Sequence, residues 1–177
     1  MGTAKKPQKV KLVIGMLAKN KKLFDMAEEF FIKRFGPIDY ESPALLFNYT
    51  DYYKKEMGSP LKRQFISFEK PISPEKITDI KLFTNSIEEK LCVHKKRRIN
   101  IDPGYMSDSK LVLATTKEHF HRIYLNKGIY AEVTLYWRKG SFQPFEWTYP
   151  DYRTREYIDI LNAIRKVKCK TGQRNIP

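Results

Sequence analysis

The stretch HRIYLNKGIYAEVTLYW (residues 121–137) decides the fold. Two runs rich in aromatic and branched residues, 122–125 and 129–137, flank the polar loop NKG (126–128). A three-residue loop that ends in glycine, between two such runs, is typical of a β-hairpin. The stretch therefore predicts two antiparallel neighbours within a sheet.

The register of this hairpin gathers polar side chains on one face. With Leu125 opposite Ile129, side chains alternate between two faces along both strands. One face then carries Arg122, Tyr124, Tyr130, Glu132, Thr134 and Tyr136. The other face, which we expect to be core, carries His121, Ile123, Leu125, Ile129, Ala131, Val133, Leu135 and Trp137. The first face is either a solvated surface with a cross-strand ion pair or a binding surface, since Tyr and Arg are enriched at recognition sites.

Outward from the hairpin, hydrophobic periodicity and capping residues predict the other elements. Five further strands are expected at residues 10–17, 40–48, 62–69, 111–115 and 142–145. Helices are expected after the caps Asn20, Ser73 and Thr154, and the first of them ends at Gly36-Pro37. Asp102-Pro103-Gly104 is interpreted as a turn.

The resulting order is β-α-β-β-α-β-β-β-β-α, which predicts an α+β fold with a mainly antiparallel sheet. Its first half, β-α-β-β-α-β, is the ferredoxin-like order. The second half extends the sheet with a β-meander and adds a C-terminal helix. We expect residues 9–169 to form a single domain, between a disordered basic leader (1–8) and a disordered tail (170–177).

The composition is that of a basic domain without a membrane span. The 177 residues include 34 Lys and Arg against 20 Asp and Glu, which gives a net charge of +14. This charge favours polyanionic partners such as RNA, but lysines spread along a chain also serve solubility. Cys92 and Cys169 are expected to be free thiols. Without an apolar run of ~20 residues or a secretion signal, the expected location is cytoplasmic.

Two further segments have the composition of site loops. TDYYKKEMG (50–58) places carboxylates, phenols and a glycine between two strands. In RRINIDPGY (97–105), Arg98, Asn100 and Asp102 alternate onto one face of a short strand. That row is either a phosphate- or sugar-binding edge or a solvated row in which Asp102 serves the turn.

Motifs of several common enzymes are missing from the sequence. It has no P-loop, no G-x-G-x-x-G and no G-x-S-x-G. His119 and His121 form an H-x-H pair for which Asp102 or Glu132 would be a third metal ligand. Because His121 lies on the predicted core face, a core histidine is the better interpretation, and we predict no metal site. No particular cofactor is indicated.

Five segments resemble a bacterial family, the domain-of-unknown-function family numbered 4416. They are TDYYKKEMG (50–58), NIDPGY (100–105), HRIYL (121–125), GIYAEVTL (128–135) and TYPDYR (148–153). The resemblance covers nearly the whole chain and implies a small, single-domain, cytoplasmic bacterial protein. It transfers no activity and no catalytic residue. It draws attention to Asp51, Tyr52, Tyr53, Asp102 and Tyr105 without giving them a role.

The leading functional hypothesis is a module that binds a phosphate-bearing ligand, a nucleotide or RNA, on a Tyr- and Arg-rich sheet face. The expected binding residues are Tyr52, Tyr53, Arg63, Arg98, Asn100, Tyr105, Lys117, Arg122, Tyr124 and Tyr130. The second hypothesis is a small hydrolase or transferase acting on a phosphorylated substrate. Its candidate general bases or Mg²⁺ ligands are Asp51, Glu56, Asp102 and Glu132. The third is a protein-interaction module, and the sequence does not set the oligomeric state.

Overall fold

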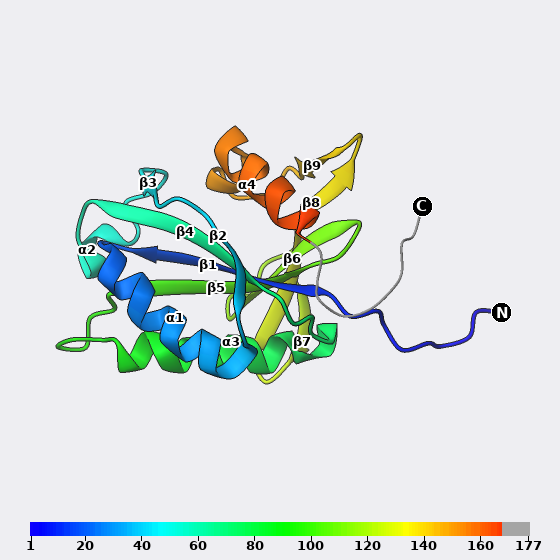
Figure 1. Ribbon diagram of the computed structural model, residues 1–177, viewed down its shortest axis with the longest axis horizontal. Helices are drawn as coiled ribbons and strands as arrows, with labels where there is room; N and C mark the ends of the chain where they lie inside the picture. Colours follow the sequence, from blue (N-terminus) through cyan, green and yellow to red (C-terminus); the bar gives the residue numbers. More distant parts are fainter. Residues whose placement is uncertain (168–177) are drawn as a thin grey trace.

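Nine strands form one antiparallel sheet in the computed structural model, which describes residues 1–167 (Figure 1). The strands are β1 Lys11–Ala18, β2 Ile38–Glu41, β3 Leu45–Phe47, β4 Leu61–Phe68, β5 Ile99–Met106, β6 Lys110–Thr115, β7 Ile123–Asn126, β8 Ile129–Arg138 and β9 Ser141–Pro144. The helices are α1 Lys21–Phe35, α2 Lys54–Met57, α3 Ile77–Lys90 and α4 Arg155–Lys166, with 3-10 turns η1 Pro74–Lys76 and η2 Asp151–Arg153. Cys169 and the predicted tail 170–177 lie outside the described residues.

The strand order is β2-β4-β1-β5-β6-β8-β7, with β3 beside β4 and β9 beside β8. β1 and β2 run in the same direction with β4 between them, and β4 and β5 do so with β1 between them. These two split β-α-β units are the ferredoxin-like arrangement. The α+β fold with an antiparallel sheet and its extension by β6–β9 are confirmed.

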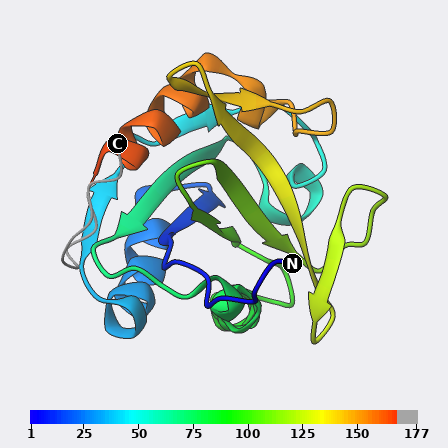
Figure 2. The same ribbon diagram turned by 90° about the vertical axis from the view of Figure 1, so that its right-hand side faces the viewer.

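Helices cover both faces of the sheet. Alternate residues of β1 and β5, such as Ile14 and Ile101, pack with α1 and α3 in one buried cluster. On the other face, Val13 and Phe65 pack with η2, α4, β8 and β9. Figure 2 shows the sheet curled between α3 and α4, which lie on opposite sides of it. Arg63, Asn100 and Asp102 lie on the α4 side of the sheet, whereas Tyr105 packs with Ile77 of α3.

Of the predicted helix ends, the caps Asn20 and Thr154 and the end at Gly36 are confirmed. The Asn20 side chain accepts a hydrogen bond from the Leu23 amide at 3.2 Å, and Gly36 ends α1 with a φ of 91°. Thr154 likewise caps α4. The cap expected at Ser73 is wrong, because its side chain makes no capping hydrogen bond and it precedes the 3-10 turn η1, while α3 begins at Ile77. The single strand predicted at 40–48 is wrong, because β2 ends at Glu41 and β3 begins at Leu45. The proline in the Ser42-Pro43 break has no amide proton for a ladder.

The turn predicted at Asp102-Pro103-Gly104 is also wrong, since all three residues lie within β5. β5 pairs with β6 only over Gly104–Met106. Pro103 has no N–H to offer on that side, so the ladder stops there. A side chain at Gly104 would place its Cβ 2.4 Å from the Val112 carbonyl oxygen. Glycine at this position therefore lets the β6 backbone approach β5 closely. The two residues open the sheet between β5 and β6.

The hairpin prediction is confirmed in part. Tyr124 lies opposite Tyr130 as predicted, but a bulge places Asn126 opposite Ile129, and the expected Leu125–Ile129 pair is wrong. Ile123 is 70% exposed, so the expectation that it is core is wrong, and Leu125 is also exposed. Both belong to β7, the last strand in the sheet order, which has a neighbouring strand on one side only.

Two other predictions concern the N-terminal segment and membrane-spanning helices. Residues 1–9 are exposed and form neither helix nor strand. Among residues 1–167, no helix is both long enough and apolar enough to cross a membrane.

Candidate functional site

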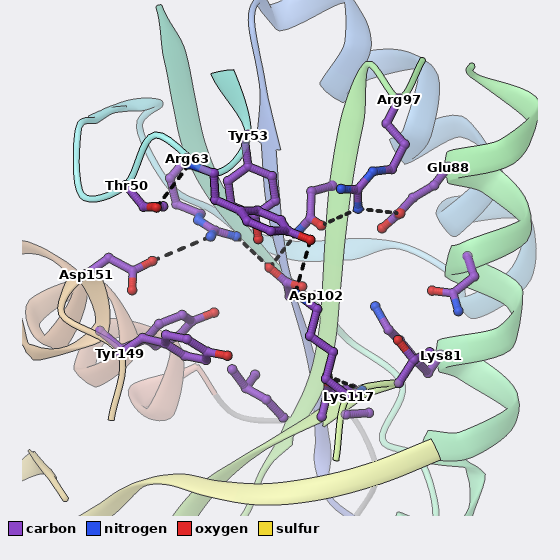
Figure 3. Close-up of a pocket in the computed structure, with 18 of the residues that line it drawn as sticks. Thr50, Tyr53, Arg63, Lys81, Glu88, Arg97, Asp102, Lys117, Tyr149 and Asp151 are labelled. Atoms are coloured by element: carbon purple, nitrogen blue, oxygen red, sulfur yellow. Dashed lines mark hydrogen bonds and ion pairs between the residues drawn. The ribbon is translucent and has the colours of Figure 1, made fainter. Parts of the chain in front are cut away.

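A cavity of about 710 Å³ lies where β5 and β6 separate (Figure 3). Its walls are the first half of β5, the end of β6 with the loop that follows it, one face of α3, the segment 47–53, and the segment 149–152. Cavities of about 300–1,000 Å³ hold small-molecule ligands in proteins. The opening created by Pro103 therefore has the size of a ligand site.

The floor of the cavity is built around Arg63 of β4, whose side chain is only 4% exposed. One terminal nitrogen of its guanidinium lies 3.0 Å from Asp102, and the other lies 3.5 Å from Asp151. Figure 3 shows Arg63 between these two carboxylates. Asn100 donates a second hydrogen bond to Asp102 at 2.8 Å. Strand alternation brings Asn100 and Asp102 to this face, as predicted, while Ile101 faces the helices.

The two carboxylates of the floor are in different electrostatic states. Burial disfavours an ionised Asp102, but the charges of Arg63 and Lys81 outweigh it, and the pKa of Asp102 lies below its ordinary value. At Asp151 burial prevails over the attraction of Arg63, and the pKa is raised. The surroundings therefore shift the pKa values of the two carboxyl groups in opposite directions.

The α3 wall stabilises the strand edge that β6 leaves unpaired. Lys81 Nζ donates to the Ile101 carbonyl at 2.8 Å, and Glu88 accepts from the Ile101 amide at 2.6 Å. Both side chains are buried, and burial raises the pKa of Glu88. Arg97 closes this wall by contacts with Glu56, Asn100 and Glu88. Two α3 side chains therefore replace a sheet partner.

The rim carries two cations beside tyrosine rings. Lys117 Nζ lies 4.5 Å from the centre of the Tyr52 ring. Arg122 lies 2.8 Å from Glu132 and donates to the Tyr149 hydroxyl at 2.7 Å. Among residues 1–167 no carboxylate pairs with Lys117, whereas Arg122 is neutralised by Glu132. Lys117 is thus the cation of the rim that is most available to a ligand.

The charges of the lining balance. Five cations and five carboxylates line the cavity: Arg63, Lys81, Arg97, Lys117 and Arg122, against Glu88, Glu89, Asp102, Glu132 and Asp151. The net charge of +14 is therefore carried elsewhere on the chain. A lining of this kind suits a small polar ligand better than a polyanion.

The structure brings many of the sequence-predicted site residues together. Those that line the cavity are Tyr52, Tyr53, Arg63, Asn100, Asp102, Lys117, Arg122 and Glu132. Those that do not line it are Asp51, Glu56, Arg98, Tyr105, Tyr124 and Tyr130. The TDYY segment, the β5 row and the start of the hairpin thus meet over the sheet.

The predicted residues outside the cavity have other surroundings. Asp51 is exposed and pairs with Lys54, and Glu56 pairs with Arg97 behind the wall. Tyr105 packs against a small apolar cluster. Arg98 is exposed, and Tyr124 and Tyr130 contact each other within the hairpin, outside the cavity lining. An Asp51–Asp102–Glu132 cluster is therefore not assembled, since Asp51 lies outside the lining.

Sequence reasoning missed several lining residues. Lys81 and Glu88 lie on one face of α3, where no sequence motif indicates a site. Tyr149 lies in the loop between β9 and η2. Asp151 lies in η2 before the last helix and is also buried beside Arg63. The available signal was an aspartate between Pro150 and Tyr152, shortly before a helix cap.

The histidine pair lies beside a second hollow of about 440 Å³, outside this lining. The side chain of His121 is largely buried, stacks on Trp147 and contacts Glu132 at 3.2 Å. Within the described residues, no three His, Cys, Asp or Glu side chains are grouped so as to hold a metal ion.

The fold and the cavity define an antiparallel α+β protein with a polar, charge-balanced cavity between two strands of its sheet. The chain belongs to the family described as a domain of unknown function (DUF4416), whose family model matches residues 8–167. This confirms the resemblance noted from the sequence. Comparison with the curated proteins and with the solved structures found no match.

Proposed function

We propose that the protein binds a small phosphate-bearing ligand of mononucleotide size in the cavity. The observation that carries the proposal is the rim, where Lys117 lies over Tyr52 and Arg122 contacts Tyr149 at the mouth of a 710 Å³ cavity. Lys117 supplies an unneutralised cation for a phosphate. Tyr52 and Tyr149 are 60% and 47% exposed, which leaves ring surface available to stack on a base.

RNA is the less favoured ligand. Binding of a polyanion draws on an excess of positive charge, and the cavity lining is balanced. Of the residues expected to contact RNA, Arg98, Tyr124 and Tyr130 lie away from the cavity. RNA binding at this site would appear as an affinity that falls steeply with salt, while binding of a mononucleotide depends on salt only weakly.

Isothermal titration with AMP, GMP, CMP, UMP, ribose 5-phosphate and inorganic phosphate tests the proposal. At least one nucleotide is expected to bind saturably and more tightly than inorganic phosphate. Lys117→Gln should weaken that binding roughly 10- to 100-fold, the usual cost of a lost charge-assisted hydrogen bond. Lys110→Gln is the matched control, because Lys110 is exposed at the start of β6, the strand that precedes Lys117, and does not line the cavity.

Two outcomes would refute the proposal. One is that none of the six compounds binds, and the other is that Lys117→Gln and Lys110→Gln bind equally well.

A second candidate function, a hydrolase or transferase acting on a phosphorylated substrate, is supported by the buried carboxylates of the lining. Asp102, Glu132 and Asp151 are groups able to accept or donate a proton to a ligand in the cavity. The Mg²⁺ version that used Asp51 is set aside, because Asp51 is exposed outside the lining.

A protein-interaction role has its own supporting observation. Phe120, Ile123 and Tyr124 are 81%, 70% and 57% exposed and lie within five residues of one another in the sequence, so apolar side chains are exposed at the start of the β7 edge. This surface is separate from the cavity, and the two roles do not exclude each other.

A further inference from the structure

We propose that one end of the sheet binds the phosphate backbone of a nucleic acid, through cations that do not line the cavity. This surface, the basic end, consists of the segments 19–25, 51–62 and 94–98. It lies where β1 stops and where β4 and β5 begin. The proposal goes beyond the mononucleotide site and does not depend on it.

The basic end carries half of the net charge of +14. Its three segments contain ten Lys and Arg against three Asp and Glu. Each of these carboxylates already has a cationic partner, in the pairs Asp25–Lys21, Asp51–Lys54 and Glu56–Arg97. The other seven cations pair with no carboxylate of residues 1–167 and lie outside the cavity lining: Lys19, Lys22, Lys55, Lys62, Lys95, Lys96 and Arg98. Six of them are exposed and Lys62 is half-buried.

Strand pairing brings these cations together. Ala18, the last residue of β1, lies opposite Lys62 of β4 on one side and opposite Ile99 of β5 on the other. Lys19 follows this row and Arg98 precedes it, on neighbouring strands that lie about 4.8 Å apart. Figure 1 shows α2, the start of α1 and the turn between α3 and β5 at the same end of the molecule, on the left. Segments that are distant in the sequence therefore form one positive surface.

The turn between α3 and β5 presents its cations from a fixed backbone. Val93 and Lys96 exchange two backbone hydrogen bonds, of 3.1 and 3.0 Å. The two residues between them, a histidine and a lysine, have φ values of 50° and 61°, which Asn and Gly adopt more readily. Arg97 joins the turn to α2 through hydrogen bonds of 3.0 and 2.8 Å to Glu56. Charged side chains therefore occupy a turn in which uncharged residues would be more favourable.

The side chains of the basic end fit a nucleic acid better than a membrane surface. Proteins that bind at a membrane surface bury apolar side chains, commonly Trp, Phe and Leu, in addition to using charge. Among the described residues, the three segments expose no Trp or Phe, and the exposed aliphatic side chains that adjoin them are Leu46 and Val93. Binding to a phosphate backbone requires only cations, because their contact with phosphates releases counterions.

Fluorescence anisotropy of the full chain with a labelled single-stranded RNA tests the proposal. With about five phosphates contacted, affinity should fall about 100-fold between about 50 and about 200 mM salt. The variant Lys55→Gln/Lys96→Gln/Arg98→Gln removes three of the seven cations, so it should bind more weakly and reduce the fall to about 10-fold. The matched control, Lys33→Gln/Lys70→Gln/Lys110→Gln, removes the same charge from exposed lysines outside the basic end and should keep the 100-fold fall.

A second measurement does not depend on the variants' folding. Ultraviolet cross-linking of the RNA to the wild-type protein, followed by mass spectrometry, should mark peptides of the three segments. Cross-links that all lie outside these segments would overturn the proposal. So would absence of RNA binding, a flat salt response, or equal weakening in the variant and its control.

Two competing explanations have their own measurements. Vesicles of phosphatidylcholine and phosphatidylserine that bind the protein when RNA does not would assign the basic end to a membrane surface and overturn the proposal. Displacement of the RNA by a mononucleotide would place it in the cavity and also overturn the proposal. If no mononucleotide binds but RNA does, the proposed function fails and the basic end stands.

Discussion

The cavity floor and the β7 edge contain similar side chains in opposite surroundings. Tyr152 and Tyr157 form an edge-to-face pair with ring centres 5.8 Å apart, buried beside the floor. Tyr124 and Tyr130 form a similar pair at 5.3 Å, where Tyr124 is 57% exposed. The difference shows that burial by the surrounding elements, rather than residue type, determines how much a side chain contributes to stability.

The ion pairs of the two regions follow the same contrast. Arg63 and Asp102 meet at 3.0 Å in the buried floor, and Lys127 of the hairpin loop meets Asp79 at 2.8 Å in solvent. Removal of one partner from a buried pair leaves a charge without compensation, whereas solvent replaces the partner of an exposed one. Stability measurements can therefore separate the two regions.

The largest expected effect is that of Arg63→Met. It removes the one cation that contacts both Asp102 and Asp151, and should lower the free energy of unfolding by about 3–5 kcal/mol. Urea denaturation measures the change. The control Lys127→Met breaks the exposed pair and should leave the unfolding free energy nearly unchanged. Equal losses in the two variants would contradict the contrast between the regions.

The next effect is a pH dependence of opposite sign at the two floor carboxylates. The pKa of Asp102 is lowered by Arg63 and Lys81 against burial, so its stabilisation is present above the unfolded value of about 3.9 and lost below the folded one. The pKa of Asp151 is raised by burial, so its contribution is present below about 3.9 and lost as pH rises through the folded value.

Substitution of each aspartate by Asn tests these two opposite pH dependences of stability. Asp102→Asn should cost more stability at about pH 7 than at about pH 3, and Asp151→Asn should cost less at about pH 7 than at about pH 3. Thermal unfolding of the wild type and both variants at the two pH values measures the differences. Parallel pH dependences in the two variants would show that the carboxyl groups share one environment.

Much of the fold could be predicted because its signals are local. Asn20, Gly36 and Thr154 mark helix ends by their own backbone and side-chain chemistry. The element order then limits the sheet to few arrangements. Pro103 and Gly104 misled the prediction because their role is not local: one omits an amide toward β6, and the other lets the β6 backbone approach.

The candidate site was less predictable, since its walls come from distant segments. Alternation placed Asn100 and Asp102 on one face from the sequence, and the hairpin register placed Arg122 near Glu132. The partner of Asp102 across the floor, Asp151, is 49 positions later in the chain, and only the tertiary fold brings it to Arg63. Pairing rules within a segment carry no information about such contacts.

The smallest expected effect is that of Tyr124→Ser at the β7 edge. The ring is mostly exposed and contacts Tyr130 from one side, so its removal should cost about 0.5 kcal/mol or less in urea denaturation. The same substitution in the buried pair, Tyr157→Ser, should cost about 3 kcal/mol or more.

A loss at Tyr124 comparable to that at Tyr157 would break the comparison in an informative way, because it would mean that another surface covers the β7 edge in solution. Stability that depends on protein concentration would then identify that surface as a second copy of the chain, since association adds to the folded state by mass action. A small loss that is independent of concentration would keep the edge as an exposed strand and leave the cavity floor as the region where buried charge is concentrated.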